Sequence, residues 1–168
     1  MEKLTQERVI EKLQERFGGG ILEIHKHYDI FTVTFDQNVI HDAVKFLHDD
    51  EELQFGFMTT MCGLHYPTQE KELGLMYQFH QLNQNVRIRF KTFFTKNNAE
   101  VPTVTDIYKT ANWMEREAYD FYGIRFTGHP NLKRILNVEE MDYFPMRKEY
   151  KLEDETREDK NDAMFGRD

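Results

Sequence analysis

The side chains that could do chemistry unaided are few, and the first candidates are two histidines. His25 and His27 lie two residues apart in a stretch expected to be a strand, so both rings would face the same side of a sheet. That is a spacing which a metal site could use. We expect neither a nearby carboxylate nor a third histidine in register with them. We therefore interpret them as surface or half-buried histidines, with a metal site as the alternative.

A cysteine offers the second possibility. Cys62 follows an apolar stretch and has His65 close by, and a histidine so placed could activate a thiol nucleophile. The competing interpretation is a buried cysteine that packs as a small hydrophobic side chain, which is the commoner situation. The sequence contains no glycine-rich nucleotide-binding loop, no G-x-S-x-G and no H-E-x-x-H pattern. The common nucleotide-dependent and hydrolytic mechanisms therefore have no motif here.

Composition narrows the possible functions and partners of the protein further. The 168 residues include 30 acidic and 22 basic side chains, and the net charge of −8 disfavours a nucleic acid as partner, because such binding neutralises phosphates. With 39% hydrophobic residues the chain can bury a sizeable core. One cysteine cannot supply a disulfide, a cysteine-ligated iron–sulfur cluster or a structural zinc site of the usual kind. We therefore expect an intracellular protein with no cluster of its own.

Membrane and targeting segments are not expected. No apolar run approaches the roughly 20 residues needed to span a bilayer. The first twenty residues contain no apolar core of a signal peptide and are rich in glutamate. Membrane contact is therefore expected only through partners.

Hydrophobic periodicity predicts the elements that must position any site. Residues 5–17 carry apolar side chains at helical spacing, and the glycines at 18–20 follow where a helix C-terminus favours a left-handed residue. Residues 21–27 and 30–35 predict a β-hairpin. Asn38 can cap a second helix, which ends in a run of four acidic residues.

Three further strands are predicted over residues 55–61, 73–80 and 86–93. In the last two, apolar and polar side chains alternate cleanly, so that one face of each strand is apolar. The opposite face of the last strand then carries three cations, Arg87, Arg89 and Lys91. The pattern indicates an α+β fold with a mixed, mostly antiparallel sheet and helices packed on it.

A third helix is predicted over residues 106–122 and is closed by Gly123. Its face opposite the apolar one holds Trp113, Glu117 and Asp120. Beyond this helix the apolar residues show no sustained period, and the last twenty residues hold eight acids against four bases. We therefore predict an α+β domain over residues 1–124, and an extended C-terminal arm over residues 125–168 with an acidic, mobile tail that only a partner would order.

The predicted third helix is unusually rich in charge. Arg116 and Asp120 stand four residues apart, so the simplest interpretation is an ion pair on a solvated helix face, worth a few tenths of a kcal/mol. Two spacings go beyond that interpretation. They are E-R-E-x-x-D in residues 115–120 and G-H-P-x-L-x-R-I-L in residues 128–136.

Together with the sequence around residues 104–107 and the Pro-Met-Arg-Lys of residues 145–148, these spacings resemble the signature of the 30 kDa or C subunit of the respiratory NADH:quinone oxidoreductase, complex I. The dense match covers about residues 101–150. Three positions depart from the family pattern and leave the path of the arm open. They are Phe144, where a histidine is common, Met146, where a leucine is usual, and Lys151, where a proline often follows.

The resemblance implies a subunit with no cofactor or active site of its own, in the hydrophilic arm of a proton-translocating enzyme. It would pack against the quinone-site D subunit and near the iron–sulfur subunits, at the cytoplasmic face of the bacterial inner membrane. NADH, FMN, iron–sulfur clusters and quinone would be bound by partner subunits. Ten residues become candidates for the partner interface or the structural motif: Trp113, Glu115, Arg116, Glu117, Asp120, His129, Pro130, Arg134, Arg147 and Lys148.

Two alternatives stay open on the sequence. One is the equivalent small subunit of a membrane-bound hydrogenase, or of another donor-driven quinone or ferredoxin oxidoreductase, which would share these motifs. The other belongs to a different class, a free-standing cysteine enzyme that uses Cys62 and His65.

Overall fold

The N-terminal helix opens the structure, a computed structural model that describes residues 3–150. Helix α1 (Gln6–Phe17) begins where the Thr5 side chain accepts a hydrogen bond from the Arg8 N–H at 3.2 Å. The predicted helix is confirmed, but the left-handed residue after it is wrong. Gly18 keeps a right-handed φ of −47°, and a 3-10 turn over Gly18–Gly20 leads into the sheet.

The predicted hairpin is also confirmed, as strands β1 (Ile21–His27) and β2 (Ile30–Phe35), which pair antiparallel. Helix α2 (Ile40–Asp49) follows. The predicted cap of this helix is wrong, because the Asn38 side chain donates to the Asp36 carboxylate at 2.8 Å. No side chain caps the first turn of α2.

Three further strands follow, β3 (Phe57–His65), β4 (Leu73–Gln81) and β5 (Val86–Phe94), and the apolar and polar side chains of β4 and β5 alternate as predicted. Strand β3 starts and ends later than expected. Phe55 is buried before the strand begins, where its carbonyl oxygen accepts a hydrogen bond from the Tyr108 hydroxyl.

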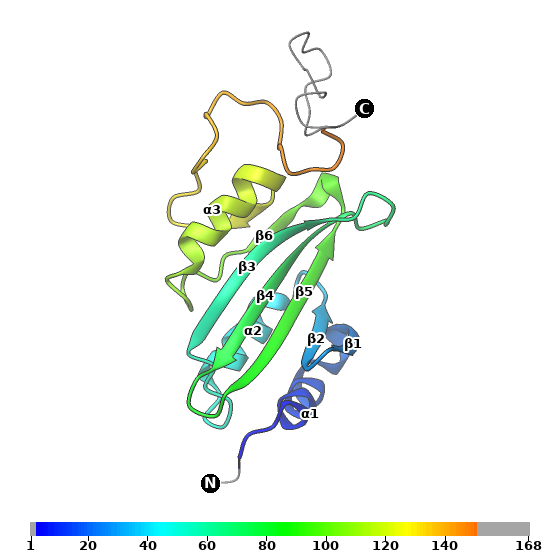
Figure 1. Ribbon diagram of the computed structural model, residues 1–168, viewed down its shortest axis with the longest axis vertical. Helices are drawn as coiled ribbons and strands as arrows, with labels where there is room; N and C mark the ends of the chain where they lie inside the picture. The colour runs from blue at the N-terminus through cyan, green and yellow to red at the C-terminus, as the bar shows by residue number, and fades with distance from the viewer. Residues whose placement is uncertain (1–2, 151–168) are drawn as a thin grey trace, which may run out of the picture.

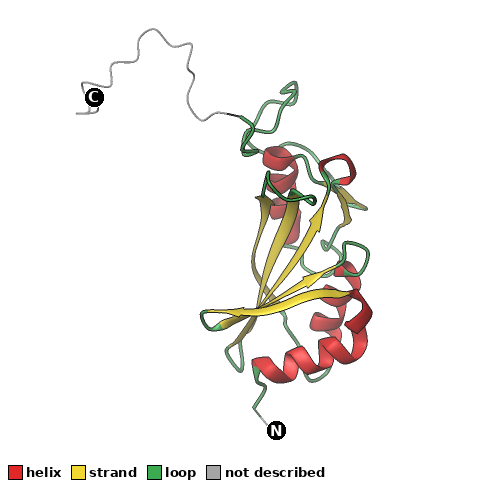
Figure 2. Cartoon of the chain, turned by 90° about the vertical axis from the view of Figure 1, so that its right-hand side faces the viewer, coloured by secondary structure: helices red, strands yellow, loops and turns green. Residues whose placement is uncertain are grey.

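The strand order is β1-β2-β5-β4-β3, and β2 pairs with β5 in parallel whereas the other pairs are antiparallel. The predicted mixed, mostly antiparallel sheet is therefore confirmed. Helix α2 lies behind β4 and β5 in Figure 1, and Figure 2 shows α1 and α2 together on one side of the sheet. Val33, Phe35 and Phe90 point to that side and are fully buried.

Helix α3 (Ala111–Tyr122) covers the other end of the same face. The ring of Tyr122 lies against Gly63 of β3 so closely that a Cβ atom there would come within 2.3 Å of it. The helix starts five residues later than predicted, because residues 106–110 form a turn in which the Val104 carbonyl accepts from the Ile107 and Tyr108 N–H groups. It ends as predicted at Gly123, which has a φ of +72°.

Two short strands that the sequence analysis missed flank α3. Strand β6 (Glu100–Pro102) pairs in parallel with β7 (Arg125–Thr127), so the predicted arm begins inside a small second sheet. Residues 128–150 are irregular, and the Met146 N–H donates to the Phe121 carbonyl of α3 at 3.2 Å. The division between a domain ending at 124 and an arm beginning at 125 stays a prediction. The predicted mobile tail from residue 151 lies outside the described residues. None of the helices within residues 3–150 is long and apolar enough to cross a bilayer.

Candidate partner interface

The charged residues of α3 divide into two groups. Glu115 and Asp120 are completely buried, whereas Glu117 is exposed and Trp113 keeps 61% of its surface in solvent. The expectation that Asp120 shares an outer face with Trp113 and Glu117 is therefore wrong. The segment after β7 folds over the helix and covers Asp120, and helical periodicity alone could not reveal that cover.

Asp120 anchors this segment. Its Oδ1 accepts from the Arg134 guanidinium at 2.9 Å, while its Oδ2 accepts from three consecutive backbone N–H groups at 2.8 to 3.0 Å, those of Ile135, Leu136 and Asn137. The amide of Asn137 adds a further hydrogen bond at 3.0 Å. The ion pair between Arg116 and Asp120 does not form. The partner of the carboxylate is instead Arg134, fourteen residues along the chain.

Five donors on one carboxylate decide its ionisation. Burial alone would raise the pKa of Asp120, but the hydrogen bonds from the Asn137 and Leu136 backbone, the Asn137 amide and the Ile135 backbone outweigh that effect. The pKa of Asp120 therefore falls well below its ordinary value of 3.8. The group is a permanent anion at neutral pH.

Two arginines hold the rest of the segment against the end of α3. Arg134 also donates to the Met141 carbonyl at 2.7 Å, and Arg147 donates to the Tyr122 carbonyl at 2.8 Å. Both guanidinium groups lie over the ring of Phe144, at 5.1 Å and 4.6 Å from its centroid. Residues 134–147 thus form a covering loop whose contacts are within the chain.

Glu115 joins the other end of α3 to the loop after β6. Its carboxylate accepts from the Thr103 hydroxyl at 2.5 Å and from the Val104 N–H at 2.8 Å. The buried ring of His129 approaches it, with Nε2 at 4.0 Å from Oε2. The backbone of Asn131 donates to Nδ1 of His129, so Nε2 carries the proton and donates to the Asn112 carbonyl at 3.2 Å.

This surrounding is poor in positive charge. Burial raises the pKa of Glu115 to about 7, against the opposing effect of its two hydrogen bonds. Asp106 adds to the increase, and His41 works against it. Glu115 is the one carboxyl in α3 poised to titrate near neutral pH.

Arg116 and Trp113 lie at the border between the buried groups and the solvent. The Arg116 guanidinium donates to the carbonyl groups of Lys133 and Arg134 at 3.1 and 3.0 Å, and it lies 5.2 Å from the Trp113 ring centroid. Both contacts leave the outer face of the indole open. The sequence analysis paired Arg116 with Asp120, whereas in the structure its partners are these two carbonyl groups.

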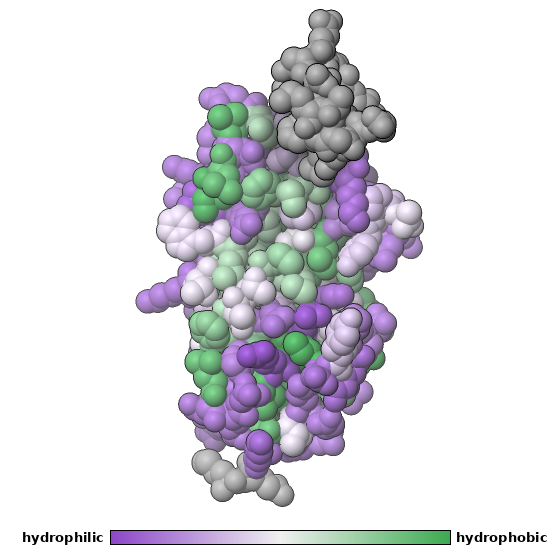
Figure 3. All heavy atoms as spheres, viewed as in Figure 1, coloured by the Kyte–Doolittle hydropathy of each residue, from purple (hydrophilic) through white to green (hydrophobic). Residues whose placement is uncertain are grey.

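The exposed part of the covering loop combines apolar side chains with the acids Glu139, Glu140 and Asp142. Leu136 and Val138 keep 73% and 63% of their surfaces in solvent, because the backbone N–H groups of residues 135–137 turn inward to Asp120. Figure 3 shows hydrophobic side chains gathered over the part of the chain that follows β7. Together with Trp113 they offer apolar contact area to another protein.

The remaining candidates contribute little to this network. Glu117 and Pro130 are exposed, and the Lys148 side chain is exposed while its backbone N–H donates to Nδ1 of His65 at 2.9 Å. Two contributors were missed by the sequence analysis, Thr103 and Asn137. A hydroxyl and an amide in aperiodic segments gave no signal of the carboxylates they meet.

The structure does not assemble the cysteine site. Cys62 and His65 are three residues apart on β3, so their side chains point to opposite faces of the sheet. Burial raises the pKa of the Cys62 thiol, and the charge of Glu117 adds to the effect, which disfavours the thiolate. Among residues 3–150 no three histidine, cysteine, aspartate or glutamate side chains gather as metal ligands, so His25 and His27 have no third partner there.

Two solved structures resemble this fold. A trypsin-resistant fragment of Nqo5 has a TM-score of 0.65 and 26% sequence identity, and the match covers 75% of this chain and 98% of the fragment. A chain of the membrane-bound sulfane sulfur reductase, an archaeal respiratory membrane complex, has a TM-score of 0.72 at 23% identity over 87% of this chain and 85% of that one. The second likeness shows the fold alone.

The fold and the buried network define a class, an α+β domain whose buried charged side chains are hydrogen-bonded to other parts of the same chain. The family follows from the sequence. The chain belongs to the family of the 30 kDa subunit of respiratory-chain NADH dehydrogenase, whose model matches residues 33–156. The resemblance seen in residues 101–150 is thereby confirmed.

The relatives agree with this assignment. The C subunit of NADH-quinone oxidoreductase from Xanthobacter autotrophicus is 42% identical over 79% of this chain, and the match spans 63% of that relative's length. Its counterpart from Citrifermentans bemidjiense is 34% identical over 90% of this chain and 92% of its own length. The chain thus spans under two thirds of the first relative and nearly all of the second.

Proposed function

We propose that this protein is a non-catalytic structural and assembly subunit of a proton-translocating NADH:quinone oxidoreductase. The observation that carries the proposal is the family match over residues 33–156, together with two relatives that are each the C subunit of an NADH-quinone oxidoreductase. In this role the chain contributes shape and contacts, while electrons pass from NADH to quinone through other subunits.

The geometry supports a role without chemistry on this chain. The buried side chains that sequence reasoning singled out, Asp120, Arg134 and Arg147, form hydrogen bonds within the chain. Cys62 and His65 are separated by the sheet. We accordingly propose that NADH, FMN, iron–sulfur clusters and quinone are bound by partner subunits and that this chain binds no cofactor.

The proposed place of the subunit is the hydrophilic arm of the complex, at the cytoplasmic face of the bacterial inner membrane. Its proposed neighbours are the quinone-site D subunit and the iron–sulfur subunits. The exposed apolar residues beside α3, Trp113, Leu136 and Val138, are the contact area we assign to such a neighbour. Membrane contact would then be made only through the complex.

Affinity capture tests this proposal. The chain is tagged in its own cells, membranes are solubilised, and the captured complex is analysed for its subunits and for electron transfer from NADH to quinone. We expect flavin- and cluster-containing subunits to be captured with the chain and the complex to be active. Capture of the chain without an NADH-oxidising subunit would contradict the proposal.

A second candidate is the equivalent subunit of a complex that takes electrons from another donor. The fold it shares with a chain of the archaeal sulfane sulfur reductase complex favours this alternative. The captured subunits separate the two candidates, because only the first contains a flavin-dependent NADH-oxidising module. Genes adjacent to the one encoding this chain provide an independent check.

A further inference from the structure

The face of the sheet opposite the helices carries charge that the described chain leaves unused. Strand β5 directs three cations to this face at every second residue, Arg87, Arg89 and Lys91, as the sequence predicted. Within residues 3–150 none of the three forms an ion pair, although the chain as a whole carries a net charge of −8. Three neighbouring uncompensated cations are therefore a local exception in an acidic protein.

The centre of this face also contains polar atoms that find no partner in the described part of the chain. Thr32 of β2 pairs in register with Arg89, and His25 of β1 pairs with Thr32. Nε of Arg89 and Oγ1 of Thr32 are buried without hydrogen-bond partners there, and the contact of Nδ1 of His25 is the Glu23 carboxylate at 3.6 Å, beyond hydrogen-bond distance. Another guanidinium nitrogen of Arg89 donates to Gln78 of β4 at 3.2 Å. A row of polar groups thus crosses three strands with part of its hydrogen-bonding capacity unused. Buried polar groups in folded proteins rarely lack hydrogen-bond partners.

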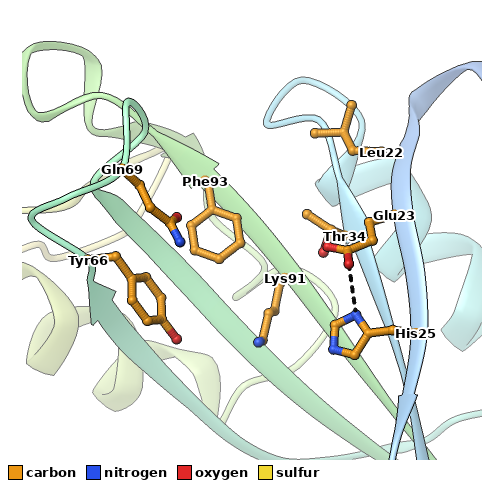
Figure 4. Close-up of a pocket in the computed structure, with 8 residues that line it drawn as sticks. All are labelled: Leu22, Glu23, His25, Thr34, Tyr66, Gln69, Lys91 and Phe93. Atoms are coloured by element: carbon orange, nitrogen blue, oxygen red, sulfur yellow. Dashed lines mark ion pairs between the residues drawn. The ribbon is translucent and has the colours of Figure 1, made fainter.

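Next to this row the face is hollowed. Figure 4 shows the hollow between β1 on one side and the residues after β3 on the other, with Lys91 on its floor. Tyr66 and Phe93 form its aromatic wall, with ring centroids 5.9 Å apart. On the β1 side the Glu23 carboxylate stands 3.6 Å from His25 and is the one acid among the described residues that lines the hollow. The hollow offers a cation, aromatic surface and open polar groups to a ligand.

We propose that this uncovered face binds an extended, acidic segment of a partner subunit, with alternate carboxylates of the segment paired to Arg87, Arg89 and Lys91. The inference rests on the proposed function, since the partner is another subunit of the same complex. Side chains two apart on a strand are spaced by about 7 Å, and an extended peptide repeats at the same interval. A line of three cations therefore matches a peptide with an acid at every second residue.

Other anionic partners match less well. A nucleic acid is repelled by the net charge of −8. A membrane of anionic lipids presents a plane of charge, whereas these cations form a single line in the middle of a five-stranded sheet.

Photo-cross-linking in the intact complex tests which segment lies on this face of the sheet. Benzoylphenylalanine is placed at Gln78, beside Arg89, and for comparison at Lys45 on the exposed side of α2. The complex is purified through a tagged partner subunit, and the cross-linked peptides are sequenced. We expect position 78 to label one partner segment with acids at alternate residues and position 45 not to label that segment.

Every other result at position 78 overturns the inference. These results are a cross-link to lipid, to residues 151–168 of this chain, to a segment without alternate acids, or no cross-link in the assembled complex. The proposed function is judged separately, by whether the chain is purified with NADH-oxidising subunits. It can therefore stand when the inference fails.

Charge reversal supplies the second measurement. Arg87→Glu combined with Lys91→Glu should lower the affinity for the partner about tenfold or more, and the matched control Lys45→Glu should leave it unchanged. The melting temperature of each isolated variant shows whether the fold is intact. Reversing two acids of the cross-linked segment to lysine should restore binding to the Arg87→Glu, Lys91→Glu chain. Intact folding with unchanged affinity in the double variant would overturn the inference.

Discussion

Asp120 and Glu115 lie five residues apart on α3 and are both fully buried, yet their carboxyl groups respond to burial in opposite ways. Asp120 has a guanidinium and four neutral donors around it, and its pKa falls far below the ordinary value. Glu115 has a hydroxyl and one backbone N–H as donors, and burial raises its pKa to about 7. The number and charge of the donors, and not burial itself, decide whether a buried acid stays ionised.

The two sites also differ in what they attach. Asp120 holds the covering loop against α3 through hydrogen bonds from the loop backbone. Glu115 fixes Thr103 and Val104, next to the short β6–β7 sheet. Four measurements test this difference between the two acids.

The largest effect is expected from Asp120→Asn. The substitution keeps the size of the side chain but leaves the Arg134 guanidinium buried without a counter-charge. We expect the free energy of unfolding, measured by urea denaturation, to fall by about 3–5 kcal/mol. The exposed Glu117→Gln is the control and should change it by less than about 0.5 kcal/mol. Equal effects of the two substitutions would show that the Asp120 network does not stabilise the chain.

Amide hydrogen exchange of the isolated chain measures the attachment of the covering loop directly. The N–H groups of residues 135–137 donate to Asp120, and those of Glu139 and Glu140 make no hydrogen bond within residues 3–150. We expect the first group to exchange about 100-fold more slowly than the second, equivalent to about 2.7 kcal/mol. Similar rates in both groups would mean that the loop is ordered only by a partner, as the sequence alone suggested.

Glu115→Gln should reveal the opposite behaviour of the second acid. The folded-state pKa of Glu115, about 7, exceeds the ordinary value of 4.5, so the folded chain holds the proton more tightly. The resulting stabilisation is complete below about pH 4.5 and is lost as the pH rises through about 7. Glutamine carries no charge, and its carbonyl oxygen can accept from the Val104 N–H while its NH2 group donates to the Thr103 hydroxyl oxygen. We expect the variant to match the parent at pH 4.5 and to exceed it by about 1–3 kcal/mol at pH 8.

Thermal melts across this pH range check the Glu115 prediction. The neighbouring titratable groups are His129, Asp106 and His41. Glu117→Gln again serves as the control, because Glu117 is exposed. A parent and a Glu115→Gln variant with the same pH dependence would contradict the assigned titration.

The smallest change in stability is expected for Arg116, which lies between the buried groups and the solvent. Arg116→Ala removes two hydrogen bonds to backbone carbonyls that are part-buried or exposed. We therefore expect the free energy of unfolding of the isolated chain to fall by about 1 kcal/mol or less. The amount of assembled complex on native gels should fall further, since the residue also lies against the exposed Trp113. The NADH:quinone rate per assembled particle should hold. Full assembly with a greatly reduced rate per particle would indicate that this chain takes part in catalysis or shapes the quinone site.

Sequence periodicity predicted the parts of the fold in which each element carries its own pattern. Helix α1, the hairpin and strands β4 and β5 alternate or repeat clearly enough to be located. Strands β6 and β7 are three residues long, too short to show a period. Helix α3 was extended back to residue 106 because Ile107 continues the apolar spacing, although the chain there forms a turn around Val104.

The motif drew attention to the helix that carries the buried acids but did not predict which residues they contact. The residue types in E-R-E-x-x-D marked the right helix, and the rule that charges face solvent then placed Asp120 outside. The donors to its carboxylate all lie in a segment with no periodicity, residues 134–137. Three of these bonds come from the backbone, which any residue type except proline could donate, so no side-chain pattern announces them.

The parallel pairing of β2 with β5 also determines when the chain can fold during its synthesis. Roughly 60 residues separate the end of β2 at Phe35 from the end of β5 at Phe94. At 5–20 residues per second a ribosome needs about 3–12 s to add them. During that time the hairpin and α1 have no central strand, and the apolar side chains of Val33 and Phe35 stay uncovered by the rest of the sheet. The first third of the protein therefore depends on whatever protects nascent chains until β5 has emerged, and slow codons before Phe94 would lengthen that dependence.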